Sequence, residues 1–183
     1  MKCRGLSVLL PALVLAACND AAEAPAVPEA TAPTASAEPA PVPTGPERRI
    51  LAFGDSLFAG YGLEEGEGYP DVLEAALRRR GINAHVIDAG VSGDTTAAGR
   101  QRLGFVLDSQ PGPPDLAIVE LGGNDLLRGI SPAETRENLA AILTELQRRR
   151  IPVLLMGMRA PPNLGAAYVA EFDGLYPALA REF

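Results

Sequence analysis

The sequence has no tryptophan, only two cysteines and a single histidine, and these scarcities exclude several kinds of site. Cys3 lies in a leader-like N-terminus and Cys18 at its end, so the rest of the chain has no cysteine for a disulfide, a zinc site or a thiol nucleophile. No segment resembles a phosphate-cradling loop or a cluster of metal ligands, so the sequence predicts neither a metal nor an organic cofactor. The net charge of −7 argues against nucleic acid as a partner, because phosphate binding needs a basic surface.

Residues 1–17 have the pattern of a bacterial lipoprotein signal peptide. The chain begins with a basic segment, and the apolar segment from Leu6 to Leu15 is too short to span a bilayer. It ends in Leu15-Ala16-Ala17-Cys18, which resembles the lipobox, where the leader is cleaved before the cysteine and the cysteine is acylated. We therefore expect an exported protein of the bacterial cell envelope or periplasm, anchored to a membrane through Cys18. The alternative is an ordinary secretory signal followed by an incidental cysteine.

Residues 18–47 differ in composition from the rest of the chain. They are rich in Ala, Pro, Glu, Thr and Val, and contain no aromatic residue, Leu or Ile. Such a segment buries too little apolar surface to offset its ordering entropy, so we expect a disordered tether. Residues 48–183 have the length of one domain and show no internal repeat.

Within residues 48–183, apolar segments that predict strands alternate with segments of helical periodicity. Strands buried on both faces and separated by helices predict a parallel sheet covered on both sides. Right-handed crossovers reduce the choice to a doubly wound, flavodoxin-like, three-layer α/β/α domain. The expected strands are 50–53, 84–89, 116–121 and 152–156. The first two expected helices are 69–80 and a segment that starts near Thr95. Two more are expected, one after the capping box Ser131-Pro132-Ala133-Glu134 and one with an apolar stripe from Tyr168 to Phe183.

Polar residues follow three of the predicted strands at the point where each strand ends. Asp55-Ser56 follows the first strand, Ser92-Gly93-Asp94 the second, and Gly123-Asn124-Asp125 the third. The carboxyl ends of parallel strands open on the same edge of a sheet, so these residues can meet around one cleft. A hydroxyl, a backbone N–H without a neighbouring side chain and a carboxamide are the nucleophile and oxyanion donors that acyl transfer needs. Each motif alone is typical of an ordinary turn, so the hypothesis depends on all three.

These motifs, in this order, resemble the first three blocks of the SGNH hydrolases, also called GDSL esterases and lipases. The matching segments are Gly54-Asp55-Ser56-Leu57, Gly93 in a Ser-Gly-Asp-Thr turn, and Gly122-Gly123-Asn124-Asp125. The chain is most similar to the bacterial thioesterase, lysophospholipase and arylesterase branch, over essentially the whole folded part. The resemblance implies that Ser56 is the nucleophile and that its N–H, the Gly93 N–H and the Asn124 side chain form the oxyanion hole. Asp55 and Asp94 are expected to organise turns and cap helices.

The resemblance also implies the activity and its substrates. We expect a serine esterase that cleaves small acyl esters, thioesters or lysophospholipids through an acyl-serine intermediate. The alternative is a non-catalytic, lipid-anchored envelope protein that keeps an SGNH-like binding fold. The sequence gives no indication of oligomeric state.

One family motif, an Asp-x-x-His after a fifth strand, is not found, so no catalytic His or Asp is assigned. His85 lies in the second predicted strand and is interpreted as a strand residue. Asp173-Gly174-Leu175-Tyr176 has the spacing with tyrosine in place of histidine, but its periodicity places it within the last helix. We therefore expect an SGNH domain truncated after four strands, with the fourth strand as an open edge. Loss of one member of a triad costs about 10⁶ in turnover, so the expected esterase activity is very low.

Overall fold

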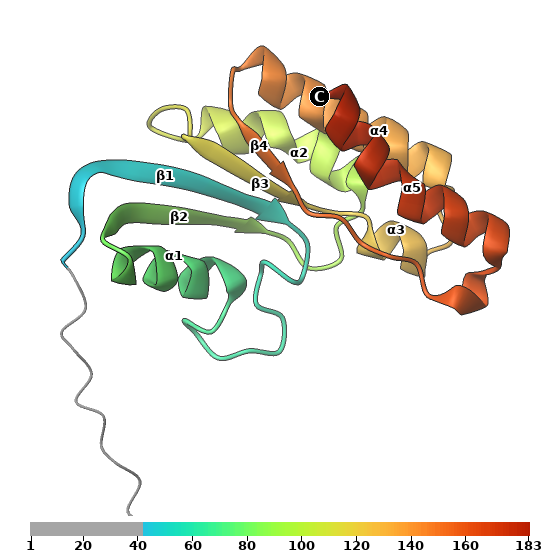
Figure 1. The fold of residues 1–183 in the computed structure, drawn as a ribbon, viewed down its shortest axis with the longest axis horizontal. Helices are drawn as coiled ribbons and strands as arrows, with labels where there is room; N and C mark the ends of the chain where they lie inside the picture. The colour runs from blue at the N-terminus through green and yellow to red at the C-terminus, as the bar shows by residue number, and fades with distance from the viewer. Residues whose placement is uncertain (1–41) are drawn as a thin grey trace, which may run out of the picture. The chain divides into compact units, whose positions relative to one another are not determined.

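The computed structural model describes residues 42–183, in which four strands alternate with helices (Figure 1). The predicted signal peptide 1–17, the lipidation site Cys18 and most of the predicted tether lie outside these residues. The elements in chain order are β1 (Thr44–Gly54), α1 (Tyr69–Arg79), β2 (Ile82–Gly90), α2 (Thr96–Asp108), β3 (Leu116–Glu120), α3 (Gly123–Leu127), α4 (Pro132–Arg148), β4 (Val153–Leu155), a short 3-10 helix (Pro162–Leu164) and α5 (Ala166–Glu182).

The strands form one parallel sheet in the order β2-β1-β3-β4. Helix α1 covers one face of this sheet, and α2, α4 and α5 lie on the opposite face (Figure 1). The prediction of a parallel sheet with helices on both sides is confirmed. Because consecutive strands are joined through helices, their carboxyl ends all point to one edge.

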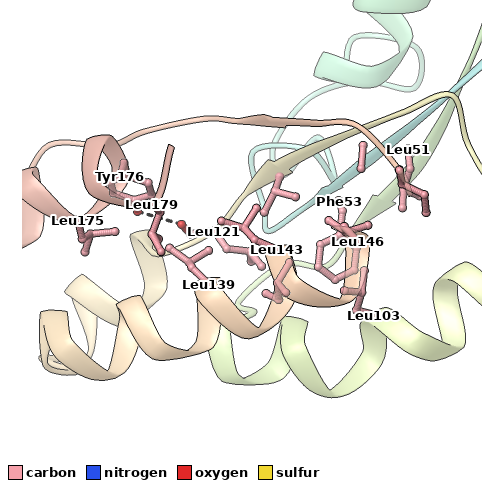
Figure 2. Close-up of a cluster of buried hydrophobic side chains, with 14 of the residues drawn as sticks. Leu51, Phe53, Leu103, Leu121, Leu139, Leu143, Leu146, Leu175, Tyr176 and Leu179 are labelled. Atoms are coloured by element: carbon pink, nitrogen blue, oxygen red, sulfur yellow. Dashed lines mark hydrogen bonds between the residues drawn. The ribbon is translucent and has the colours of Figure 1, made fainter. Parts of the chain in front are cut away.

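Strand β1 lies between β2 and β3 and is buried on both faces. Ile50 and Ala52 pack in the cluster beneath α1, whereas Leu51 and Phe53 pack in the larger cluster shared with α2, α4 and α5 (Figure 2). Successive side chains of a strand point to opposite faces of the sheet, so this strand contributes alternately to the two clusters. Full burial of side chains of this size stabilises the fold by about 1.5–3 kcal/mol each, so the strand that precedes Ser56 is firmly held.

The ends of two helices are fixed by side-chain caps. The Ser131 hydroxyl accepts a 3.2 Å hydrogen bond from the N–H of Glu134, and α4 begins at the next residue, Pro132. Thr95 caps α2 in the same way by accepting a bond from the N–H of Ala98. Such caps satisfy N–H groups that have no partner within the helix. The predicted N-cap Ser131 and the proline at the first helical position are confirmed, and of the capping box the bond to the Ser131 hydroxyl is present.

The amino end of β1 and the carboxyl end of the chain differ from the expected boundaries. β1 begins at Thr44, inside the segment predicted as tether, and the N–H of Thr44 donates a 3.2 Å bond to the carbonyl of Gly81. Backbone pairing of this kind needs no apolar side chain, which explains why composition did not predict it. Phe183 was assigned to the apolar stripe of the last helix, but it lies one residue beyond the end of α5 and is 41% exposed.

Strand β4 is at one edge of the sheet. Within residues 42–183 it pairs only with β3, and about half of the Leu154 side chain is exposed. A cavity of about 500 Å³ lies beside it, between β4 and the last turns of α4 and α5. The predicted open edge is therefore present in the described part of the chain. None of the helices in that part combines the length and apolarity needed to cross a bilayer.

Candidate active site

Strands β1, β2 and β3 end at the same level of the sheet. Gly54, the last residue of β1, is paired in register with Gly90 at the end of β2 and with Glu120 at the end of β3. The residues that follow these three ends therefore emerge side by side. Ser56, Gly93 and Asn124 are each within a few residues of a strand end, which gives them a common location on this edge.

Ser56 lies in a tight turn directly after β1 and is partly exposed. The turn is closed by a 3.1 Å bond from the N–H of Ala59 to the carbonyl of Asp55. Gly90 permits this arrangement, because a Cβ atom there would collide with the backbone of Phe58 and Ala59. The Ser56 hydroxyl is 3.5 Å from Asp55 Oδ1, a long contact that leaves it free to meet a substrate.

Gly93 follows β2 in a conformation that favours glycine, with φ of 86°. Its carbonyl accepts a 2.7 Å bond from Nη2 of Arg128, which fixes the orientation of the peptide. Within residues 42–183, neither the N–H of Gly93 nor that of Ser56 donates a hydrogen bond to another protein atom. Two backbone N–H groups at this edge of the sheet thus have no protein acceptor in the described residues.

Asn124 lies in the short helix α3, where the sequence predicted only a loop. Its Nδ2 atom donates a 3.0 Å bond to Asp55 Oδ2 and another 3.0 Å bond to the carbonyl of Asp94. One carboxamide therefore connects the segments that follow β1, β2 and β3. Both of its N–H groups are engaged in this state, so Asn124 must release one of these bonds to donate to an oxyanion.

Asp55 is buried at the centre of these contacts. Its Oδ1 atom accepts a 3.1 Å bond from the N–H of Leu57, which organises the turn that contains Ser56. Its Oδ2 atom orients Asn124. The carboxylate of Asp55 thus connects the turn that contains Ser56 to the carboxamide of Asn124.

Arg102 joins the turn after β1 to the loop after β2, a role that sequence analysis missed. Its Nε atom is 2.6 Å from Asp94 Oδ2, and its Nη2 atom donates a 2.9 Å bond to the carbonyl of Gly54. The guanidinium also stacks over the ring of Phe53, 4.1 Å from its centre. No local pattern marks this arginine, because its partners lie on other elements of the fold.

Glu120, at the end of β3, is a second buried carboxyl group that the sequence analysis did not single out. Its Oε2 atom accepts a 3.4 Å bond from the N–H of Asp55. Its Oε1 atom is the one buried side-chain polar atom in residues 42–183 that has no hydrogen-bond partner. Burial first, and then the negative charge of Asp55, raise the pKa of Glu120 to about 7.

Asp125 is also fully buried, but it serves the scaffold. Its carboxylate accepts a 2.8 Å bond from the N–H of Thr96 and bonds from the hydroxyls of Thr96 and Thr135. It therefore ties α3 to the first turns of α2 and α4. A negative charge at the start of α2 is also favoured by the helix dipole.

Neither His85 nor Asp173 faces Ser56. His85 lies within β2, and its Nδ1 atom is 3.5 Å from Glu74 Oε2 on α1. Asp173 Oδ1 accepts a 2.8 Å bond from the N–H of Ala160. In the described part of the chain, no three His, Cys, Asp or Glu side chains are grouped to hold a metal ion.

Comparison with protein families and known sequences gives consistent matches. The profile of the GDSL-like Lipase/Acylhydrolase family matches residues 52–183. The chain is 38% identical over 133 residues to "Esterase TesA" of Pseudomonas aeruginosa, covering 73% of this chain and 65% of the relative. It is 38% identical over 134 residues to "Thioesterase 1/protease 1/lysophospholipase L1" of Escherichia coli K12, covering 73% and 62%. The chain thus spans somewhat less than two thirds of the length of these relatives.

Among solved structures, the fold is similar to that of AlinE4, which is described as an SGNH-hydrolase family esterase. The two chains are 74% identical and superpose with a TM-score of 0.74. The match covers 76% of this chain and 74% of AlinE4.

Proposed function

Because this chain belongs to the GDSL-like lipase/acylhydrolase family, we propose that it is a serine ester hydrolase whose nucleophile is Ser56. The observation that carries the proposal is the double hydrogen bond of Asn124 to Asp55 and to the carbonyl of Asp94. These bonds bring the segments after three strands together at one sheet edge. Such a convergence brings to one edge a hydroxyl and several N–H groups, which are the nucleophile and the oxyanion donors that acyl transfer needs.

In the proposed reaction, the Ser56 Oγ attacks the carbonyl carbon of the ester and loses its proton to a base. The carbonyl oxygen becomes an oxyanion that accepts bonds from the N–H groups of Ser56 and Gly93 and from one N–H of Asn124. Expulsion of the alcohol or thiol, which takes up a proton, leaves an acyl-serine. Water then attacks the acyl carbon, releasing the carboxylic acid and restoring the hydroxyl.

The one histidine of the chain does not fit the role of base, since His85 contacts Glu74 on α1. Residues 1–183 are therefore expected to turn over esters about 10⁶-fold more slowly than an enzyme with a complete triad. The backbone N–H groups can still stabilise the oxyanion when the base is missing, so the residual rate of ester hydrolysis should exceed the uncatalysed rate in water. Formation of an acyl-serine is thus a better test than turnover.

We assign the substrate class from the relatives and from the surroundings of Ser56. Names of the relatives include esterase, thioesterase and lysophospholipase activities. Two apolar side chains, those of Leu57 directly after Ser56 and Leu127 at the end of α3, are 63% and 79% exposed. Apolar surface at this place suits the hydrocarbon part of an acyl ester, thioester or lysophospholipid. Export and lipid anchoring through Cys18 remain part of the proposal, on the strength of the lipobox-like sequence.

The test is to treat the full chain with excess p-nitrophenyl butyrate and to locate the acyl adduct by mass spectrometry of peptides. We expect an adduct on Ser56 that disappears in Ser56→Ala. Ser109→Ala is the matched control, because the Ser109 hydroxyl is exposed at the end of α2 and bonds to the carbonyl of Val106. An adduct that persists in Ser56→Ala would contradict the mechanism. If the wild-type chain is acylated no faster than Ser56→Ala, the result favours the non-catalytic alternative.

A further inference from the structure

Glu120 contributes a buried carboxyl group directly beneath the turn that contains Ser56. A Cβ atom built on Gly54 would lie 2.9 Å from Glu120 Oε2, so the carboxyl group fills the space left by that glycine. The ring of Phe58 covers the same space. The carboxyl group is therefore packed against the turn and shielded from solvent on the face of the sheet that carries α1.

The hydrogen bonds of this carboxyl group are unequal. Oε2 accepts the N–H of Asp55, whereas Oε1 is buried without any partner in the described residues. An ionised carboxylate in that state would keep its charge in a region of low dielectric with one oxygen unsatisfied, which is costly. A proton on Oε1 removes the charge and leaves the bond from Asp55 intact; the resulting O–H has no acceptor in the described residues, but an unpaired neutral group costs far less than an unpaired buried charge.

The charged groups around Glu120 do not offset a negative charge. From the segment after β1 it faces the Asp55 carboxylate, and from α5 the neutral hydroxyl of Tyr176 is also near enough to sense its charge. No arginine forms an ion pair with Glu120 within residues 42–183, and Arg102 directs its guanidinium to Asp94 and the Gly54 carbonyl. Burial and Asp55 both raise the pKa of Glu120.

We propose that Glu120 is a positioning residue that carries a proton on Oε1 and thereby limits the buried Asp55–Glu120 pair to one negative charge. Both oxygens of Asp55 accept hydrogen bonds, from the N–H of Leu57 and from Nδ2 of Asn124, so a negative charge is better satisfied there than on Glu120 and orients Asn124 and the Ser56 turn. Ionisation of Glu120 would add a second negative charge beneath the place where the oxyanion forms and would oppose that oxyanion. The inference rests on the proposed function, because it gives Glu120 an effect on reaction at Ser56.

Two measurements on the full chain separate this inference from the proposed function. The first follows the ¹³C carboxyl resonance of Glu120 and the Nδ2 proton resonances of Asn124 by NMR between pH 5 and 9. We expect both to titrate together with a midpoint near 7, and the Asn124 transition to vanish in Glu120→Gln. A Glu120 resonance that stays ionised across this range, or an Asn124 transition that persists in Glu120→Gln, would overturn the inference even if Ser56 is reactive.

The second measurement is the rate of Ser56 acylation by p-nitrophenyl butyrate as a function of pH. The ratio of the Glu120→Gln rate to the wild-type rate should be near one at pH 5.5 and rise about tenfold by pH 8.5, a change that a buried charge at short range can produce. A merely structural role would change the ratio equally at all pH values and would overturn the inference. If Ser56 does not react at all, the proposed function fails, while the NMR titration still decides the protonation of Glu120.

Glu74→Gln is the matched control for both measurements. Glu74 also accepts a bond from a strand N–H, that of Val86 at 2.7 Å, but it lies on α1. We expect this variant to keep the wild-type Asn124 titration and acylation profile. If Glu74→Gln reproduced the effect of Glu120→Gln, the effect would come from the loss of any negative charge and not from the position of Glu120, and the inference would be wrong.

Discussion

The hydroxyl of Tyr176 on α5 donates a 2.9 Å hydrogen bond to the carbonyl of Leu121, directly after β3 (Figure 2). The bond lies in the core, and burial raises the pKa of this hydroxyl, so it remains a donor at every pH of interest. The next residue, Gly122, has φ of 121°, and a Cβ atom there would collide with the Tyr176 hydroxyl. Tyr176 therefore fixes the path of the chain into α3 and Asn124.

Removal of this hydroxyl should destabilise the domain. In Tyr176→Phe the buried Leu121 carbonyl loses its donor, so the free energy of unfolding should fall by about 1–3 kcal/mol. The control is Tyr168→Phe, whose hydroxyl donates to the carbonyl of Ile130 in a less buried setting and should cost less. Urea unfolding measures both. If both variants lost the same free energy of unfolding, burial of the Tyr176 hydrogen bond would not be the cause of its larger predicted effect.

Replacement of Asp125 should have a larger effect. Asp125→Ala leaves the N–H and the hydroxyl of Thr96 without an acceptor in the core, whereas the Thr135 hydroxyl keeps the carbonyl of Ser131 at 3.1 Å; the free energy of unfolding should fall by about 3–5 kcal/mol. Asp115→Ala is the comparison, since Asp115 also accepts a 2.8 Å bond from a backbone N–H, that of Arg49, but at an exposed site. Its removal should cost about 1 kcal/mol or less. Chemical denaturation that ranked the two variants in the opposite order would show that Asp125 is not a scaffold anchor.

Two glycines of α2 should respond in opposite directions to alanine. Nothing lies within 4 Å of a Cβ atom on Gly104, so Gly104→Ala should stabilise the domain by about 0.5–1 kcal/mol through helix propensity. A Cβ atom on Gly99 would lie 2.5 Å from Leu121 Cδ1, so Gly99→Ala should destabilise it by about 1–3 kcal/mol. Thermal unfolding checks the sign of each change. A stabilising Gly99→Ala would mean that α2 can move away from Leu121.

Glu120 should make stability depend on pH. Its folded pKa of about 7 lies above the ordinary value of 4.5, so its stabilising contribution is complete below about pH 4.5 and is lost as the pH rises through 7. Relative to wild type, Glu120→Gln should therefore gain roughly 2–3 kcal/mol of stability between pH 5 and 8. Urea denaturation at several pH values measures this difference. Parallel curves for the two proteins would indicate that Glu120 ionises normally in the fold.

Much of the fold could be predicted because its signals are local. The apolar run 50–53 predicted a doubly buried strand, and the Ser131 capping box predicted the start of α4 within a few residues. Helix α3 was missed because five residues that begin Gly-Asn-Asp are typical of a turn. The start of β1 at Thr44 was missed because it depends on backbone pairing with the segment around Ile82.

For the candidate site, the motifs predicted which residues gather at the sheet edge but not how they are bonded. Arg102 and Tyr176 act on the carbonyls of Gly54 and Leu121, respectively 48 and 55 residues away. Glu120 stood in a predicted strand, and nothing in its neighbours along the chain indicated that its carboxyl group would be sealed beneath the Ser56 turn. These roles depend on packing between distant elements, which no short pattern records.

The attachment of Ser56 to β1 has a consequence for amide hydrogen exchange. Leu51, Ala52 and Phe53 have no exposed surface and pair on both sides, so their amide hydrogens should exchange with deuterium only when the whole domain opens. Beyond Ser56 the chain enters a loop in which the Tyr61 side chain is 81% exposed; its amides, such as that of Tyr61 bonded to the Ser56 carbonyl, are held only by turn hydrogen bonds and should exchange through local opening, faster than those of β1. Ser56 thus stands at the border between a strand that exchanges only on global opening and a loop that opens locally, so the loop beside it can fluctuate to admit a ligand without displacing the strand that holds the hydroxyl.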